Sequence, residues 1–225
     1  MAKIKVFAAN IDVALLVAGL DGEFNVQRLE RYLTLAWDCG AAPVIVLNKT
    51  DLLAGDPALA ARMDALLAIY PGLGYRVLRT SSKAGGLEEL HGALRERTSV
   101  FVGQSGVGKS SLVNSLLPEA DLRVGALSER RQKGTHTTTT AQLFHLDCGG
   151  SLIDSPGIRE FGLWHMSRAE VEQGFREFRG LLGHCKFRDC RHEGEPECAI
   201  LAALESGNIS VRRMDSYRHI VASLD

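Results

Sequence analysis

One glycine-rich segment carries residue types that bind phosphate. It consists of Gly103, Gln104, Ser105, Gly106, Val107, Gly108, Lys109, Ser110 and Ser111. An apolar run precedes it at residues 100–102, and a helical pattern follows it. Glycines let backbone N–H groups curl around phosphate oxygens, where the N-terminus of the following helix adds partial positive charge. Lys109 is then placed to reach the β- and γ-phosphates and Ser110 to ligate Mg²⁺, so the spacing favours a P-loop over a glycine-rich turn that binds nothing.

A second segment carries groups that separate guanine from adenine. Directly after the apolar run 44–47 come Asn48, Lys49, Thr50 and Asp51. This order resembles the NKxD box of GTPases. The Asp carboxylate accepts the N1–H and N2–H₂ donors of guanine, whereas adenine presents an acceptor at N1. Taken alone, the segment is equally typical of a helix cap and turn.

A third segment favours the guanine interpretation. After the next apolar run, at 76–78, come Thr80, Ser81, Ser82 and Lys83. They look like the SAK box of GTPases, in which a backbone N–H meets guanine O6. Ligands bind outside the carboxyl ends of the strands in open α/β sheets, and both segments follow strand-like runs. Together they predict a site for GTP or GDP.

Two further segments carry candidate groups for magnesium and the γ-phosphate. Asp154 and Gly157 lie in a DSPG sequence that resembles the DxxG box, whose Asp holds the Mg²⁺ shell and whose Gly N–H senses the γ-phosphate. Between this box and the P-loop, His136 precedes a run of threonines. By analogy with two-threonine switch motifs we expect Thr138 to ligate Mg²⁺, although a neighbouring threonine can serve, and a polar loop also explains the run.

The elements that position these groups alternate between short apolar runs and helical patterns. The runs at 13–17, 44–47, 76–78 and 100–102 are short and β-branched, as expected of strands buried on both faces of a parallel sheet. Residues 143–146 and 151–153 predict a hairpin that turns at Gly149 and Gly150. The stretch 118–140 is polar and fits no element. The pattern predicts an α/β fold.

The order of the boxes is unusual. Ordinary GTPases run from the P-loop through the switch threonine and DxxG to NKxD and SAK, whereas here the last two come first. Because the termini of a compact α/β domain can lie close together, joining them and reopening the chain elsewhere preserves the site. The sequence therefore predicts a circularly permuted P-loop GTPase domain over residues 1–169. A small helical zinc-binding domain is expected over residues 170–225.

Cysteine spacing predicts the zinc site. Three of the five cysteines join a histidine in a Cys-x4-Cys-x-His-x5-Cys pattern made by Cys185, Cys190, His192 and Cys198. Three thiolates and one imidazole suit tetrahedral Zn²⁺, and four protein ligands leave no open position for catalysis. His184 is a competing ligand. Reduced structural cysteines are the other explanation, which the polar surroundings disfavour.

Composition bounds the remaining possibilities. The net charge of −1 gives no support for nucleic-acid binding by bulk charge. No apolar run of membrane-spanning length and no signal-peptide pattern occur, so we expect a cytoplasmic protein. We also expect a monomer. Near the zinc ligands a basic patch carries Phe187 for stacking; it can bind RNA phosphates or be a solvated face. Its cations are Arg176, Arg179, Lys186, Arg188 and Arg191.

The permuted boxes, the DSPG sequence followed by residues 158–163 and the Cys3His cluster resemble the bacterial ribosome small subunit-dependent GTPase A family over essentially the whole chain. The resemblance implies a permuted GTPase domain, a C-terminal zinc finger, and GTP hydrolysis stimulated by the 30S subunit and its 16S rRNA in late maturation. Family members usually carry an N-terminal OB-fold, whereas here the GTPase pattern begins near Lys3.

The water-orienting residue is the last expectation. Many GTPases place a Gln after the DxxG glycine, but this chain has Ile158, whose side chain cannot orient water. Intrinsic hydrolysis should therefore be slow. The resemblance points to His136 as the substitute, with a solvated loop histidine as the alternative. Two rival functions remain: a P-loop kinase or ATPase, and a nucleotide-dependent assembly module with negligible turnover.

Overall fold

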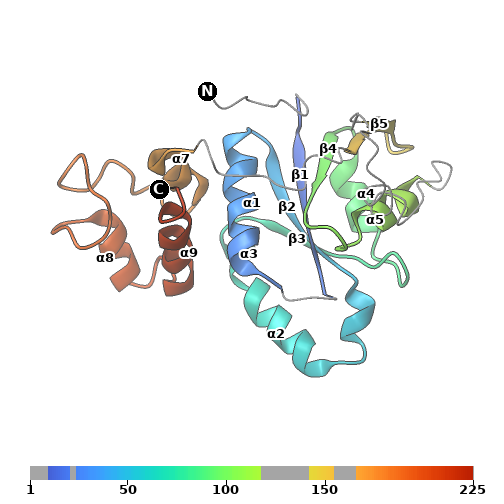
Figure 1. Cartoon of the computed structure of the whole chain (residues 1–225), viewed down its shortest axis with the longest axis horizontal. Helices are drawn as coiled ribbons and strands as arrows, with labels where there is room; N and C mark the ends of the chain where they lie inside the picture. The colour runs from blue at the N-terminus through green and yellow to red at the C-terminus, as the bar shows by residue number, and fades with distance from the viewer. Residues whose placement is uncertain (1–9, 21–23, 118–141, 155–165, 225) are drawn as a thin grey trace, which may run out of the picture. The chain divides into compact units, whose positions relative to one another are not determined.

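The computed structural model describes residues 10–20, 24–117, 142–154 and 166–224, and these form two compact units. The first unit comprises Met1–Phe24 and Gly40–Phe161, and the second comprises Asn25–Cys39 and Gly162–Asp225. We call them the sheet unit and the C-terminal unit. Figure 1 shows the sheet and the helices of both.

The sheet unit is built on a sheet with strand order β3-β2-β1-β4-β6-β5. Its strands are β1 (Val13–Gly19), β2 (Ala42–Asn48), β3 (Arg76–Arg79), β4 (Thr98–Val102), β5 (Gln142–His145) and β6 (Ser151–Asp154). The ladders joining β1, β2, β3, β4 and β6 are parallel, and β5 pairs antiparallel with β6. This confirms the predicted α/β fold and the predicted hairpin. All parallel strands end at one edge.

The strands form where apolar and β-branched residues run together. Every residue from Val13 to Val17 in β1 is at most 3% exposed, as a central parallel strand requires. Val13, Leu15 and Val17 share one face and join a core cluster with residues of α4 and α5, among them Leu90 and Leu112. Burial of this cluster fixes which way the strands face, because a one-residue slip would turn these side chains over.

The helices of the sheet unit are η1 (Thr50–Leu53), α2 (Pro57–Leu67), α3 (Ile69–Gly72), α4 (Glu88–Leu94) and α5 (Lys109–Leu116). The sequence predicted a helix directly after the P-loop, and this helix is α5. Asp56 caps α2, since its carboxylate accepts a hydrogen bond from the Leu59 N–H at 2.9 Å, and Pro57 fits the first turn. The helix α5 begins at Lys109, directly after the P-loop glycines.

The C-terminal unit is made of short helices. They are α1 (Val26–Asp38), α7 (Arg168–Gly174), α8 (Ala199–Glu205) and α9 (Val211–Val221). Its core includes the rings of Phe175, Phe178 and Tyr217, whose centroids lie 5.0–5.6 Å apart. In α7, a Cβ on Gly174 would lie 2.5 Å from Thr34 Cγ2 of α1, so the two helices approach closely.

The sequence did not indicate that α1 would group with the C-terminal residues. Residues 26–38 fall within the GTPase domain predicted over residues 1–169, and the expected boundary at residue 169 stays a prediction. In the structure the chain leaves the sheet unit after β1 and returns to it at β2. The helix between these strands therefore belongs to the C-terminal unit by its contacts.

One buried charge cluster joins α1 to α9. The Arg213 side chain, 2% exposed, pairs with Glu30 of α1, which is fully buried. Its Nε and Nη2 also donate to the two carboxylate oxygens of Glu177, at 2.5 and 3.1 Å. The guanidinium carbon lies 4.3 Å from the ring centroid of Phe175. Two carboxylates thus share one guanidinium in the interior of the unit, and we call these three residues the Arg213 cluster.

Candidate nucleotide site and metal centre

Asn48 joins the three guanine and phosphate segments at the carboxyl edge of the sheet. This residue ends β2 and is fully buried. Its Nδ2 donates to the carbonyl of Val107 in the P-loop at 2.9 Å. Its Oδ1 accepts from the Thr80 hydroxyl at 3.2 Å. The Asn48 amide thus links the P-loop to the segment that follows β3, because its nitrogen donates to one and its oxygen accepts from the other.

The P-loop glycines are needed for close backbone approach. Gly108 has a φ of +95°, and a Cβ there would lie 2.3 Å from Asn48 Nδ2. Gly103 has a φ of +155°, and a Cβ there would lie 2.4 Å from the carbonyl oxygen of Val17 in β1. Neither position tolerates a side chain. The loop is thus packed against the ends of β1 and β2, with α5 starting directly behind it.

Two ammonium groups lie on the P-loop. Lys109 Nζ donates to the carbonyl of Gly103 at 2.6 Å and also to that of Gln104. Lys49, at a left-handed φ of 64°, sends its Nζ to the carbonyl of Gly106 at 2.7 Å. The predicted role of Lys109, binding the β- and γ-phosphates, remains a prediction. The contact of Lys49 with the loop shows how the NKTD segment stays in register with it.

Asp51 is held as a hydrogen-bond acceptor. The Ser81 hydroxyl donates to its carboxylate at 2.6 Å and accepts from the backbone N–H groups of Lys83 and Ala84, both at 3.1 Å. The Ser81 hydrogen bond is the main cause that lowers the pKa of Asp51, and the Lys83 and Lys49 charges add to it. An ionised carboxylate at this place has the acceptor pattern that guanine requires.

The remaining predicted groups are only partly placed. Asp154 ends β6, and β6 pairs in parallel with β4, so the DSPG segment starts at the same edge as the P-loop. His136, Thr138 and Gly157 lie outside the described residues. Their predicted roles remain predictions.

The four predicted zinc ligands come together in the C-terminal unit. The ligand atoms of Cys185, Cys190, His192 and Cys198 lie within 4.8 Å of one another. The three sulfurs are 3.2–3.7 Å from His192 Nδ1, and the Cys185 and Cys198 sulfurs are 3.8 Å apart. A tetrahedral Zn²⁺ with its usual bond lengths needs about 3.5 Å between S and N and about 3.8 Å between sulfurs. The donor set and its spacing therefore fit zinc.

The imidazole is oriented by a carboxylate behind it. His192 Nε2 lies 3.5 Å from Glu172 Oε1, and the Tyr217 hydroxyl donates to the same oxygen at 2.9 Å. Carboxylate support of this kind fixes which nitrogen of a ligating histidine faces the metal. The competing candidate His184 is exposed and does not join the cluster among the described residues.

The fold is that of a P-loop GTPase domain with a permuted order of boxes, followed by a C-terminal Cys3His cluster. The sequence profile of the RsgA GTPase family matches residues 1–164. The chain belongs to this family, which confirms the resemblance seen in the sequence.

Relatives in sequence and structure agree with this assignment. Proteins named small ribosomal subunit biogenesis GTPase RsgA from Azotobacter vinelandii and Chromohalobacter salexigens are 58% and 56% identical over 99% of this chain. The chain spans 64% and 65% of their lengths. The structure of YjeQ from Thermotoga maritima aligns with a TM-score of 0.81 at 35% identity, covering 96% of this chain and 72% of that one.

A second solved structure carries the permutation in its description. YloQ, a circularly permuted GTPase, aligns with a TM-score of 0.77 at 31% identity, covering 96% of this chain and 68% of that one. The predicted fold class is therefore confirmed. In the part of the chain that the structure describes, no helix combines the length and the apolar character needed to cross a membrane.

Sequence reasoning named Thr80 and Ser81 but missed how they build the site. Their hydroxyl contacts with Asn48 and Asp51 do not follow from a box pattern alone. Glu172 was not predicted to stand behind His192, because the two lie on separate segments. The signal that could have suggested this contact is that Glu172 lies on the helix that precedes the Cys/His segment in the sequence.

Proposed function

We propose that this chain binds GTP and hydrolyses it, and that it acts in late maturation of the 30S ribosomal subunit, which stimulates its activity. The names of its relatives support the ribosomal role. The observation that carries the nucleotide part is the junction at Asn48, which ties the segment bearing Asp51 to the P-loop bearing Lys109. A guanine reader and a phosphate binder are thereby held at one edge.

Each predicted residue has a role in this proposal. Asp51 accepts the guanine N–H donors, and Ser81, Ser82 and Lys83 border the base. The P-loop N–H groups and Lys109 bind the phosphates. Mg²⁺ would be held by Ser110, Thr138 and Asp154, and when bound it neutralises charge on the β- and γ-phosphates. Gly157 senses the γ-phosphate through its N–H.

Water activation is assigned to His136. Ile158 follows the DxxG glycine and cannot orient water, so another side chain is needed for turnover. In this proposal, His136 orients the attacking water when the 30S subunit is bound. The same Ile158 favours the second candidate function, an assembly module that binds nucleotide and ribosomal RNA with negligible turnover.

The C-terminal unit supplies a zinc-stabilised module. Cys185, Cys190, His192 and Cys198 would hold Zn²⁺ in a structural role, since all four positions are filled by protein ligands. The cations near this cluster are proposed to contact 16S rRNA. We further propose that the protein is a cytoplasmic monomer.

Phosphate release with and without 30S subunits tests the enzymatic function. We expect slow release from GTP alone, a rise of at least 10-fold with saturating subunits, and no rise for His136→Ala. Protection against thermal unfolding should be seen with GTP but not with ATP, because adenine cannot pair with Asp51. Stronger protection by ATP would exclude a GTPase, and the absence of turnover with subunits present would favour the assembly module.

A further inference from the structure

A cavity of about 600 Å³ lies in the C-terminal unit, and the nucleotide site does not include it. Its walls are the end of α1 with Trp37 and Asp38, the helix α7, and the zinc loop, from which Cys185, Cys190 and His192 themselves line it. Part of its volume is therefore the zinc site, and the remainder is the space beside Trp37. The volume is in the range of pockets that hold small organic groups, about 300–1,000 Å³. We call it the Trp37 pocket.

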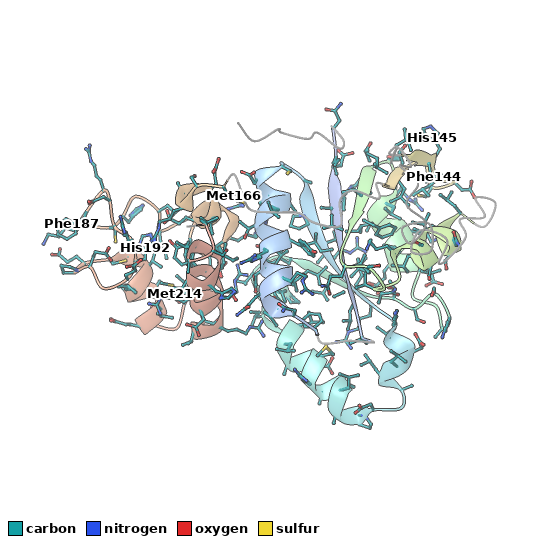
Figure 2. All side chains as sticks on the ribbon, in the orientation of Figure 1. Phe144, His145, Met166, Phe187, His192 and Met214 are labelled. Carbon is teal, nitrogen blue, oxygen red and sulfur yellow. The ribbon has the colours of Figure 1, made fainter. Side chains whose placement is uncertain are left out.

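The pocket has a flat stacking wall. The guanidinium of Arg179 covers the Trp37 ring at 4.4 Å from its centroid and is fixed by donating its Nε to the carbonyl of Gln173 at 2.7 Å. Phe187, also in the lining, is 43% exposed, although apolar side chains are normally buried. In the view of Figure 2 it lies at the outer edge of the C-terminal unit. Single-stranded RNA bases commonly stack on aromatic rings and on guanidinium planes.

The pocket also offers an unused carboxylate. Asp38 is exposed and makes no hydrogen bond or ion pair among the described residues, whereas Glu170 and Glu172 are engaged by Ser167 and Tyr217. Burial, followed by the Glu170 charge, raises the pKa of Asp38. A ligand that brings N–H donors to this carboxylate would satisfy it.

The lining of the pocket carries both signs of charge. The carboxylates of Asp38, Glu170 and Glu172 line it together with Arg179 and Arg188, so it is not a site for phosphate alone. Arg188 is exposed, and no partner for it occurs in the described ranges. A nucleotide would fit this lining if its base meets Asp38, which is exposed, and its phosphates lie near Arg188. Guanine is the base whose N1–H and N2–H₂ groups match a single carboxylate.

We propose that the Trp37 pocket binds one unstacked guanine of single-stranded RNA, by stacking on the Trp37–Arg179 wall and Phe187 and by hydrogen bonding to Asp38. This rests on the proposed partnership with ribosomal RNA and deepens it. It adds a base-reading function to a surface whose cations alone would bind any phosphate backbone.

Fluorescence anisotropy with short labelled RNAs tests the proposal. The zinc-loaded chain, with saturating GDP filling the P-loop site, is titrated with uridine heptamers whose central position is guanine, adenine or abasic. We expect the guanine heptamer to bind at least 5-fold more tightly than either of the others. Asp38→Asn should abolish this preference, and Asp215→Asn, the same change at an exposed position of α9, should leave it.

Stacking is tested separately. Phe187→Ala should weaken binding of the guanine and adenine heptamers about 5-fold without affecting the abasic one, while Val211→Ala, also at an exposed apolar residue, should change nothing. Zinc content and melting temperature of each variant check that it is folded. Equal binding of all three heptamers, or unchanged preference in Asp38→Asn, would overturn the proposal.

The outcome is separable from the proposed GTPase function. Lys109→Ala should lose GTP binding while keeping the guanine preference for RNA. If the parent hydrolyses GTP with subunits but shows no base preference, the pocket proposal fails and the GTPase stands. If the base preference is present without turnover, the enzymatic proposal fails and the pocket stands. Binding of a basic peptide in place of RNA would count against the proposal.

Discussion

The nucleotide edge and the C-terminal unit are held together by different physics. At the edge, buried parallel strands end side by side, and short hydrogen bonds from Asn48 and Ser81 set the loops. The C-terminal unit has short helices, a Cys3His cluster and two carboxylates around one buried guanidinium. Its helices are too short to be stable alone, so its order depends on charged and metal-binding groups.

This difference predicts where the molecule is fragile. A sheet buries a continuous apolar core in which each side chain has many neighbours, so the loss of one contact leaves most of the packing in place. In the C-terminal unit, single ionic groups each hold several elements, so removing one leaves other charges buried without compensation. Loss of zinc or of Arg213 should therefore disrupt this unit much more than the nucleotide edge.

Metal removal should have the largest effect. Structural zinc contributes about 10–16 kcal/mol of apparent binding free energy in zinc fingers, so Cys190→Ser should destabilise the C-terminal unit by at least about 5 kcal/mol. Hydrogen exchange should show loss of protection in residues 166–224 and retention in residues 42–117. Cys39→Ser changes an exposed cysteine of the same unit and serves as control. Equal loss of protection in both regions would show that the C-terminal unit does not depend on zinc more than the sheet unit does.

Breaking the Arg213 cluster should come next. Arg213→Met leaves Glu30 and Glu177 buried without their cation, a situation that costs about 3–5 kcal/mol. Urea unfolding with zinc present measures this loss. Arg218→Met, at an exposed position of the same helix, should change the free energy of unfolding by less than about 0.5 kcal/mol. If the two substitutions lowered the free energy of unfolding equally, the Arg213 cluster would not be important for the stability of the C-terminal unit.

At the nucleotide edge, removing the charge of Asp51 should alter nucleotide specificity and leave the free energy of unfolding almost unchanged. Asp51 is only half-buried, and an amide of the same size can still accept from Ser81, so Asp51→Asn should unfold almost like the parent. It should bind GTP about 100-fold more weakly, a loss of about 2.7 kcal/mol. Because an amide can donate to the carbonyl that xanthine has in place of the guanine amino group, xanthosine triphosphate should bind the variant better than GTP does. Calorimetry measures both affinities. Unchanged GTP binding would remove Asp51 from the site.

The nucleotide edge could be predicted from sequence largely because its signals are local. The P-loop, the strand runs and the helix start at Lys109 lie within a few residues of one another, and parallel strands bring their carboxyl ends together in any order of the chain. The zinc ligands follow the same logic, since Cys185 to Cys198 is one short segment. The structure places all four together as predicted.

Contacts between distant segments could not be predicted this way. Glu30 and Arg213 are separated by most of the chain, and an isolated Glu in an amphipathic helix is normally solvated. The pattern of α1 shows that it buries one face but not against which partner, so its grouping with α7 and α9 was missed. Ser81 gave no sign that its hydroxyl would hold Asp51. Only three-dimensional proximity reveals these partners.

The smallest predicted effect concerns pH and the Arg213 cluster. Burial raises the pKa of Glu177 to about 7 from its ordinary value of 4.5. Between these values the folded protein keeps a proton that the unfolded chain has released, so the free energy of unfolding should fall as pH rises from 4.5 to 7. The decrease from this one group should be about 1–3 kcal/mol, since Arg213 offsets part of the penalty.

Zinc opposes this trend, because its ligands bind protons at low pH and release the metal. The effect of Glu177 is therefore obtained by subtracting the free energy of unfolding of Glu177→Gln from that of the parent. The zinc contribution is the same in both proteins and cancels. Measured by urea unfolding at pH 5.5 and pH 8, the parent should lose more stability than the variant does over this range. A difference that is independent of pH would mean that Glu177 is ionised throughout, with the shared guanidinium compensating both carboxylates of the cluster.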